Sequence, residues 1–297
     1  MQTFKTVCII AGKIVLTVAI VLLLVLIGFL LYAAVTVAAG KSVDDILSFT
    51  TVNLTQMIIQ GGAFIAGTLI MYAAFERKRG WNLGFKQGRV LRRTIEGLLA
   101  GIVLMTAAGL LIWVCGGISG IGIAFDRNVL ASMSTGLLMF TIVSVNEELF
   151  ARGYLQGLIG YHFGRTVAVI ASSLLFAALH LQNNSVLDNP LPLLNLFLAG
   201  IILGVSREAS GGLWMPIGLH LTWNYFQGYV YGFEVSGTTV DSLVHLTRRG
   251  SDTISGGSFG AEGSALTTLV LLLGIFAIVH YYRSRGRSDH DRATLRP

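Results

Sequence analysis

Charged residues are scarce in this chain of 297 amino acids. Only 12% of the residues are Asp, Glu, Lys or Arg, against about 25% in soluble domains, and the mean hydropathy is +0.72. Cysteine is also nearly absent: Cys8 and Cys115 lie in or beside apolar segments, which excludes a disulfide framework and predicts two small buried side chains. The composition therefore excludes an ordinary soluble domain and indicates a membrane protein.

Several functional signatures are also missing. The sequence has no His-Glu-x-x-His zinc helix and no Gly-x-Ser-x-Gly nucleophile turn, since Ser206 lacks the second glycine. No internal repeat supports a transporter built from inverted halves. Polar residues inside the apolar segments are therefore the main guide to function.

Long apolar runs are abundant. About 20 apolar residues cross a bilayer as a helix, and the first run is too long for a signal-peptide core of roughly 7–15 residues. We predict one all-α, polytopic integral membrane domain over 1–297, with a disordered cytoplasmic tail at 283–297. Its eight expected transmembrane helices are 14–39, 57–75, 95–116, 131–151, 166–182, 191–206, 213–232 and 265–282.

The basic residues are distributed unevenly between the predicted loops. Eight spans place both termini on one side, and that side receives 17 of the 21 Lys and Arg residues. Because cytoplasmic loops are enriched in these residues, both termini are predicted to be cytoplasmic, and the short basic tails suit a bacterial plasma membrane. Contact with anionic lipid explains the net charge of +6 without a nucleic-acid partner. The opposite side receives only Lys41, Arg127, Arg248 and Arg249.

Two adjacent acids, Glu147 and Glu148, lie near the end of the fourth predicted span. A charged side chain at the centre of a membrane helix costs roughly 2.5–3.5 kcal/mol on insertion scales. Acids in such positions face protein or water, and they mark functional sites by default. This pair is therefore the first candidate for chemistry.

Three further pairs are four residues apart and so share a helix face: Glu148 with Arg152, Phe176 with His180, and His220 with Asn224. The first pair suits a structural ion pair, which leaves Glu147 without a local partner. His180 alone is equally typical of an interfacial histidine. His and Asn also join membrane helices, but two such residues on one face indicate a shared target.

Together these residues supply a carboxylate, two imidazoles and a carboxamide. A glutamate can act as general base toward water, a histidine can assist or bind a metal, and a second His with an Asn can donate to an oxyanion. This combination predicts a hydrolytic site.

A site of this kind requires the side chains to lie at the same depth in the membrane. At 1.5 Å per residue, Glu147 and His180 lie at opposed depths unless the fourth helix continues past Arg152 to about Gly160.

The order and spacing of these motifs resemble those of the CPBP family, which comprises the type II CAAX prenyl endopeptidases and bacterial relatives that include bacteriocin self-immunity proteins. The pattern is Glu-Glu-x-x-x-Arg from 147, Phe-x-x-x-His from 176 and His-x-x-x-Asn from 220. The resemblance covers roughly 131–230, the expected catalytic core. It implies an intramembrane endopeptidase that cleaves a membrane-associated protein or peptide, of CAAX type or another.

The resemblance also implies roles by position. Glu147 with His180 would activate the attacking water, and His220 with Asn224 would stabilise the oxyanion. Glu148 and Arg152 would hold the first helix in place, with Phe176 as a further supporting residue. The family has been described both as metalloproteases and as metal-independent glutamate proteases. A zinc ion on Glu147, His180 and His220 therefore stays open as a cofactor.

Two other functions stay open at this stage. The chain could be a non-catalytic immunity factor that binds its target, or a proton-coupled transporter that uses Glu147 as a relay. A relay has no use for a paired His and Asn, which favours the enzyme. The long polar loop at 233–264 is rich in glycine and suits tight turns, a flexible lid or a plain connector. The oligomeric state is not specified by the sequence.

Overall fold

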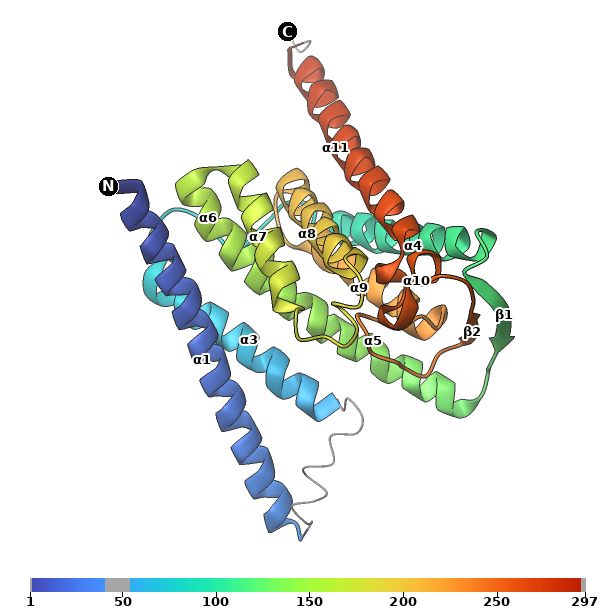
Figure 1. Ribbon diagram of the computed structural model, residues 1–297. Coiled ribbons are helices and arrows are strands. Elements are labelled where there is room, and N and C mark those ends of the chain that lie inside the picture. Colours follow the sequence, from blue (N-terminus) through green and yellow to red (C-terminus); the bar gives the residue numbers. More distant parts are fainter. Residues whose placement is uncertain (1, 41–53, 295–297) are drawn as a thin grey trace.

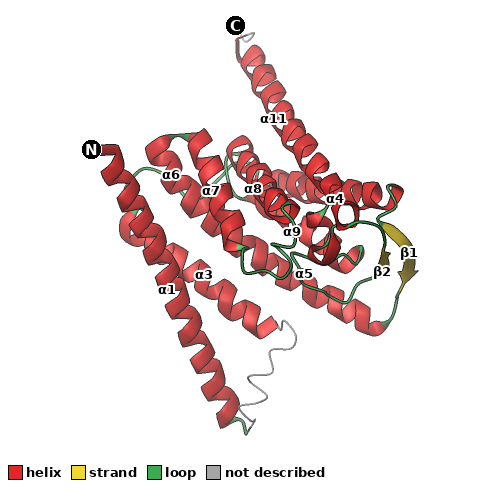
Figure 2. Cartoon of the chain, in the orientation of Figure 1, coloured by secondary structure: helices red, strands yellow, loops and turns green. Residues whose placement is uncertain are grey.

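The computed structural model describes residues 2–40 and 54–294 (Figure 1). Lys41 and Arg296, which entered the charge count, lie outside these ranges. Helices dominate the described residues, and one two-stranded antiparallel sheet, whose strands are far apart in the sequence, is the only sheet among them (Figure 2). The α-helices and strands are α1 (Gln2–Ala38), α3 (Leu54–Phe75), α4 (Val90–Val114), β1 (Ile118–Ile123), α5 (Arg127–Glu148), α6 (Gln156–Phe163), α7 (Arg165–Leu179), α8 (Leu191–Ser210), α9 (Trp214–Tyr225), β2 (Val244–Arg248), α10 (Asp252–Ser255) and α11 (Ala265–Thr294).

The predicted fold class, an all-α polytopic membrane protein, is confirmed. Within the described residues six helical segments are long and apolar enough to cross a membrane: those that contain α1, α3, α4, α5 with α6, α8 and α11. The other two expected spans are present as helices, but α7 has 15 residues, and α9 has 12 and continues through the five π-helical residues of η2 (Phe226–Val230). Both are shorter than the roughly 20 residues that a full crossing needs.

The fourth helix extends well beyond its predicted end at 151. After α5 a π-helical segment, η1 (Leu149–Leu155), leads into α6, and together they form one helical span from Arg127 to Phe163. The expected continuation past Arg152 is confirmed, and the boundary at 151 was wrong. Gly164, with φ of +83°, ends the span and reverses the chain into α7. Arg152 and Phe176 are each twelve residues from Gly164, so the reversal brings them to the same depth.

Glycines allow α4 and α9 to approach closely. A Cβ atom at Gly101 would lie 2.2 Å from Thr222 Oγ1 and 2.4 Å from the carbonyl oxygen of Leu219. Gly97 likewise faces the backbone of Met215. In a bilayer, where burial of apolar surface between helices gives little driving force, such close van der Waals packing holds helices together. The contact fixes α9, which carries two of the candidate site residues.

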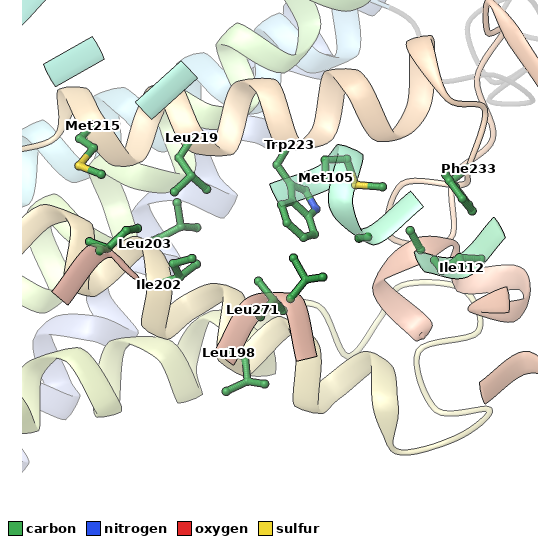
Figure 3. Close-up of a cluster of buried hydrophobic side chains, with 14 of the residues drawn as sticks. Met105, Ile112, Leu198, Ile202, Leu203, Met215, Leu219, Trp223, Phe233 and Leu271 are labelled. Atoms are coloured by element: carbon green, nitrogen blue, oxygen red, sulfur yellow. The ribbon is translucent and has the colours of Figure 1, made fainter. Parts of the chain in front are cut away.

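The largest buried cluster joins four helices behind the site (Figure 3). Met105 comes from α4, Ile202 from α8, Trp223 from α9 and Leu271 from α11, and each is at most 5% exposed. Because interiors are close-packed, α9 has little freedom to move against its neighbours.

The glycine-rich end of the loop at 233–264 forms tight turns, one of the alternatives that the sequence left open. Short 3₁₀ turns η3 (Gly257–Phe259) and η4 (Ala261–Gly263) bury the ring of Phe259. A Cβ atom at Gly260 would lie 1.9 Å from the carbonyl oxygen of Glu234, so glycine here permits a backbone contact that no other residue allows.

Two smaller expectations differ from the structure. Cys8 and Cys115 are exposed rather than buried, since Cys8 faces outward from α1 and Cys115 directly follows the last residue of α4. The tail was expected to be disordered from 283, whereas α11 continues as helix to Thr294.

Candidate active site

The two adjacent acids at the end of α5 lie in different surroundings. The side chain of Glu148 is fully buried, while that of Glu147 is 30% exposed. Arg152, also fully buried, donates from Nη1 to Glu148 Oε1 at 3.2 Å and from Nη2 to the carbonyl oxygen of Gly200 on α8 at 3.2 Å. A buried charge needs such partners because its desolvation is otherwise uncompensated. The ion pair suggested by the spacing is therefore present and joins α5 to α8.

An aromatic ring links this ion pair to both histidines. The guanidinium carbon of Arg152 lies 4.3 Å from the ring centroid of Phe176, a cation–π contact. The same ring lies 4.6 Å from the ring of His180 and 6.2 Å from that of His220. The carbonyl oxygen of Phe176 is 2.8 Å from His180 Nδ1. Phe176 thus contacts three of the residues singled out from the sequence.

His220 lies between the two glutamates. Its Nδ1 atom is 3.0 Å from Glu148 Oε1, and its Nε2 atom is 3.9 Å from Glu147 Oε2. Because an ionised carboxylate only accepts hydrogen bonds, Nδ1 donates to Glu148, which fixes the ring orientation and turns Nε2 toward Glu147. The sequence had suggested only a scaffold role for Glu148; this contact with His220 was not foreseen.

The candidate residues converge on one cavity of about 940 Å³. Glu147 from α5, His180 at the end of α7, and His220 with Asn224 from α9 all line it. Apolar side chains from α3 and α5, among them Phe64 and Met139, form much of the rest of its wall. A cavity lined mainly by apolar groups with a few converging polar ones is the usual form of a ligand site.

The first and the third of the three motifs are each followed by a π-helical segment. η1 begins one residue after Glu148, and η2 (Phe226–Val230) begins two residues after Asn224. Such wide turns are rare and occur often at functional sites. No pattern in the sequence identified them, because segments of seven and five residues are too short to show an apolar periodicity of their own.

A second polar wall of the cavity comes from residues that the sequence analysis did not name. Ser236 donates from its backbone N and its Oγ to Glu262 Oε2, at 3.0 and 2.8 Å. Asn195 on α8 donates to the carbonyl oxygens of Glu262 and Ser264 at 2.7 and 2.9 Å. The loop at 233–264 is thereby fixed against α8. An acid within a glycine-rich stretch was the only available signal for this wall.

The residues do not fit the metal site that was left open. Among the described parts of the chain, no three His, Cys, Asp or Glu side chains gather closely enough to hold a metal ion. His180 and His220 each direct Nδ1 at another protein group, namely the carbonyl of Phe176 and the carboxylate of Glu148. Such contacts are compatible with ligation through Nε2, so the spacing of the three side chains carries the conclusion. The trio of Glu147, His180 and His220 thus lines one cavity without forming a ligand set.

Fold and cavity define a polytopic helical membrane protein with a polar site inside its helical core. Residues 128–226, about a third of the chain, match the family described as type II CAAX prenyl endopeptidase Rce1-like. This match covers the segment that carries the motifs and confirms the resemblance drawn from them.

One curated relative is an uncharacterized 24.3 kDa protein of Escherichia coli. It is 35% identical over 98 residues, which make up 32% of this chain and 43% of that protein. The chain thus covers less than half the length of that relative.

Proposed function

We propose that the chain is an intramembrane endopeptidase that hydrolyses a peptide bond of a membrane-associated substrate, of CAAX type or another. The observation that carries the proposal is the asymmetry of the acid pair: Glu148 is enclosed by Arg152 and His220, while Glu147 is accessible from the cavity. The family match supports a protease in general.

The proposed reaction begins with a water molecule between Glu147 and His180. Glu147 accepts a proton from this water as the oxygen attacks the carbonyl carbon of the scissile bond, a step to which a positioned base contributes about 10²–10⁴-fold. The carbonyl oxygen becomes an oxyanion in the tetrahedral intermediate. Glu147 then passes the proton to the leaving nitrogen as the C–N bond breaks, which yields a carboxylic acid and an amine; the acid then gives its proton to the amine or to water.

His220 and Asn224 are proposed to stabilise the oxyanion. Glu148 accepts from Nδ1 of His220, so that a second proton on Nε2 makes the ring a cationic donor that faces the cavity. The Asn224 carboxamide supplies a neutral donor from the same helix face. Removing one such donor costs about 10²–10³-fold in rate in a well-studied protease. The buried pair of Glu148 and Arg152 keeps this donor in place.

The competing function is a non-catalytic membrane protein, either an immunity factor or a proton-coupled transporter. A proton relay requires only the accessible Glu147. Here a buried ion pair between Glu148 and Arg152 also holds the imidazole of His220 in one orientation. We therefore favour hydrolysis. The proposal takes the protein to lie in a bacterial plasma membrane with both termini cytoplasmic, as the distribution of Lys and Arg suggests.

The test uses the full-length protein reconstituted in lipid vesicles with a library of membrane-associated peptides, analysed by mass spectrometry. The proposal expects defined cleavage products from the wild type and none from Glu147→Gln. A well-folded wild type that cleaves no peptide, or proton transport that depends on Glu147, would support the competing function instead.

A further inference from the structure

The antiparallel sheet of β1 and β2 has two faces of opposite character. The strands β1 and β2 pair antiparallel, with Ile121 opposite Leu246 and Ile123 opposite Val244. Residues directly opposite each other lie on the same face of a sheet, so one face carries four aliphatic side chains. Large apolar side chains thus occupy one face of the sheet where β1 and β2 pair.

The other face is polar and small. Gly120 lies opposite Thr247, and Gly122 lies opposite His245. A Cβ atom at Gly120 would lie 3.2 Å from Thr247 Oγ1, which confirms that these residues share a face. Thr247 and His245 are both exposed. A sheet with one apolar and one polar face requires an apolar layer on one side.

The protein covers only part of the apolar face. Leu246 on β2 packs against the main buried cluster, but β1 lies outside β2, at the margin of the molecule (Figure 1). There Ile123 is 76% exposed, and Phe125, two residues further along the chain, is 74% exposed. Within the described residues, nothing from this chain encloses these two large side chains.

The position of β1 indicates what covers them. It is joined by three residues to the end of α4 and by three residues to the start of α5, both of which belong to candidate membrane spans. A strand between the ends of two spans lies at the membrane boundary. Trp113 and Val114, at the end of α4, are exposed as well. The exposed apolar side chains of β1 thus continue the lipid-facing surface of the helices.

We propose that the sheet of β1 and β2 is an interfacial element: the side chains of its apolar face reach the boundary of the lipid acyl chains, while its polar face remains in water. Arg127 and Arg249, both exposed and adjacent to the sheet, suit contact with lipid phosphates. Cross-strand pairing satisfies the backbone groups between the strands, and those on the outer edge of β1 stay at the level of the headgroups, because unpaired backbone is not tolerated among the acyl chains. The occupant of the exposed edge is the bilayer itself, and the inference is independent of the proposed catalytic activity.

Spin labels test this placement directly. In a Cys8→Ala, Cys115→Ala background, a nitroxide is attached to single cysteines at Ile121, Ile123 or Phe125, and the full-length protein is reconstituted in phosphatidylcholine–phosphatidylglycerol vesicles. Matched controls carry the label at His245 or Thr247 on the opposite face. Power saturation compares collision with oxygen, which concentrates in the acyl region, and with a water-soluble nickel chelate.

The proposal expects oxygen to exceed the nickel chelate severalfold at 121, 123 and 125, and the reverse at 245 and 247. It is overturned if labels on both faces collide equally with the nickel chelate. It is also overturned if labels at 123 show spin–spin broadening that disappears on dilution with unlabelled protein, because a second copy would then occupy the face. Because three exposed positions are labelled separately, the test still gives a result if one of the variants folds poorly.

Discussion

The Nδ1 atom of His220 lies 3.0 Å from Glu148 Oε1, the same oxygen that receives a hydrogen bond from Arg152. One buried carboxylate oxygen therefore joins the ion pair of the first motif to the imidazole of the third. Because α5 carries Glu148 and α9 carries His220, this contact also fixes the two helices relative to each other. Glu148 is on this geometry both a structural anchor and an orienting residue for His220.

The adjacent glutamates are expected to respond in opposite ways to replacement. Glu148→Ala leaves Arg152 buried without its counter-ion, which should lower the free energy of unfolding by about 3–5 kcal/mol. Glu147→Ala removes a partly exposed side chain and should change stability little while it abolishes cleavage. Unfolding in mixed micelles and peptide cleavage by the purified variants measure the two effects. Equal losses of stability in both variants would contradict the separation of roles.

Close packing between α4 and α9 gives a second prediction with an internal control. Gly101→Ala forces a methyl group against Thr222 Oγ1 and the Leu219 carbonyl, and such overpacking costs about 1–3 kcal/mol. Gly109→Ala on the same helix meets only Phe233 Cε2 at 3.5 Å. We expect Gly101→Ala to destabilise the protein and reduce activity through displacement of His220, and Gly109→Ala to preserve both. Thermal unfolding and cleavage rates measure both effects, and equal values for the two variants would show that α9 is loosely held.

The second polar wall of the cavity predicts an effect on substrate binding. Ser236→Ala removes one of two hydrogen bonds to the Glu262 carboxylate, and a hydrogen bond to a charged group is worth about 1.5–3 kcal/mol. We expect a higher KM for a cleaved peptide with kcat nearly unchanged, because Ser236 and Glu262 take no part in the proposed proton transfers. Ser258→Ala, at an exposed position of the same loop, is the control. A fall in kcat alone would place Ser236 in the chemistry instead.

The donor geometry predicts that cleavage does not require a bound divalent metal. Since Glu147, His180 and His220 do not gather as a ligand set within the described residues, treatment with EDTA or 1,10-phenanthroline should leave the cleavage rate of the vesicle-bound protein within about twofold, a difference of only about 0.4 kcal/mol in barrier. Loss of activity on chelation, restored by added zinc, would show that these side chains rearrange around a metal.

The sequence predicted the helical fold because span length and charge distribution are local properties of the chain. It failed at the end of the fourth span because Arg152 and Gln156 look like residues that have left the membrane. In the structure, Arg152 donates to the carbonyl oxygen of Gly200 and Gln156 to that of Gly204, so both are satisfied inside the protein. Partners on another helix cannot be read from local hydropathy.

In the candidate site, too, features local to one helix were predicted and contacts between helices were not. Helical spacing alone grouped His220 with Asn224, and both line the cavity. The contact of Glu148 with His220 depends on how α5 packs against α9, and the spacing of residues within one helix carries no such information. Glu262 reaches the cavity through turns that only glycine permits, and these have no periodicity to detect.

The central claim is that the carboxylate of Glu147 activates water for hydrolysis of a peptide bond. The most direct measurement compares wild type and Glu147→Gln in vesicles containing H₂¹⁸O, with mass spectrometry of a cleaved peptide. The account predicts that the wild type places ¹⁸O in the new C-terminal carboxylate and that the folded variant loses at least about 10²-fold in rate. Cleavage by Glu147→Gln at the wild-type rate would contradict it.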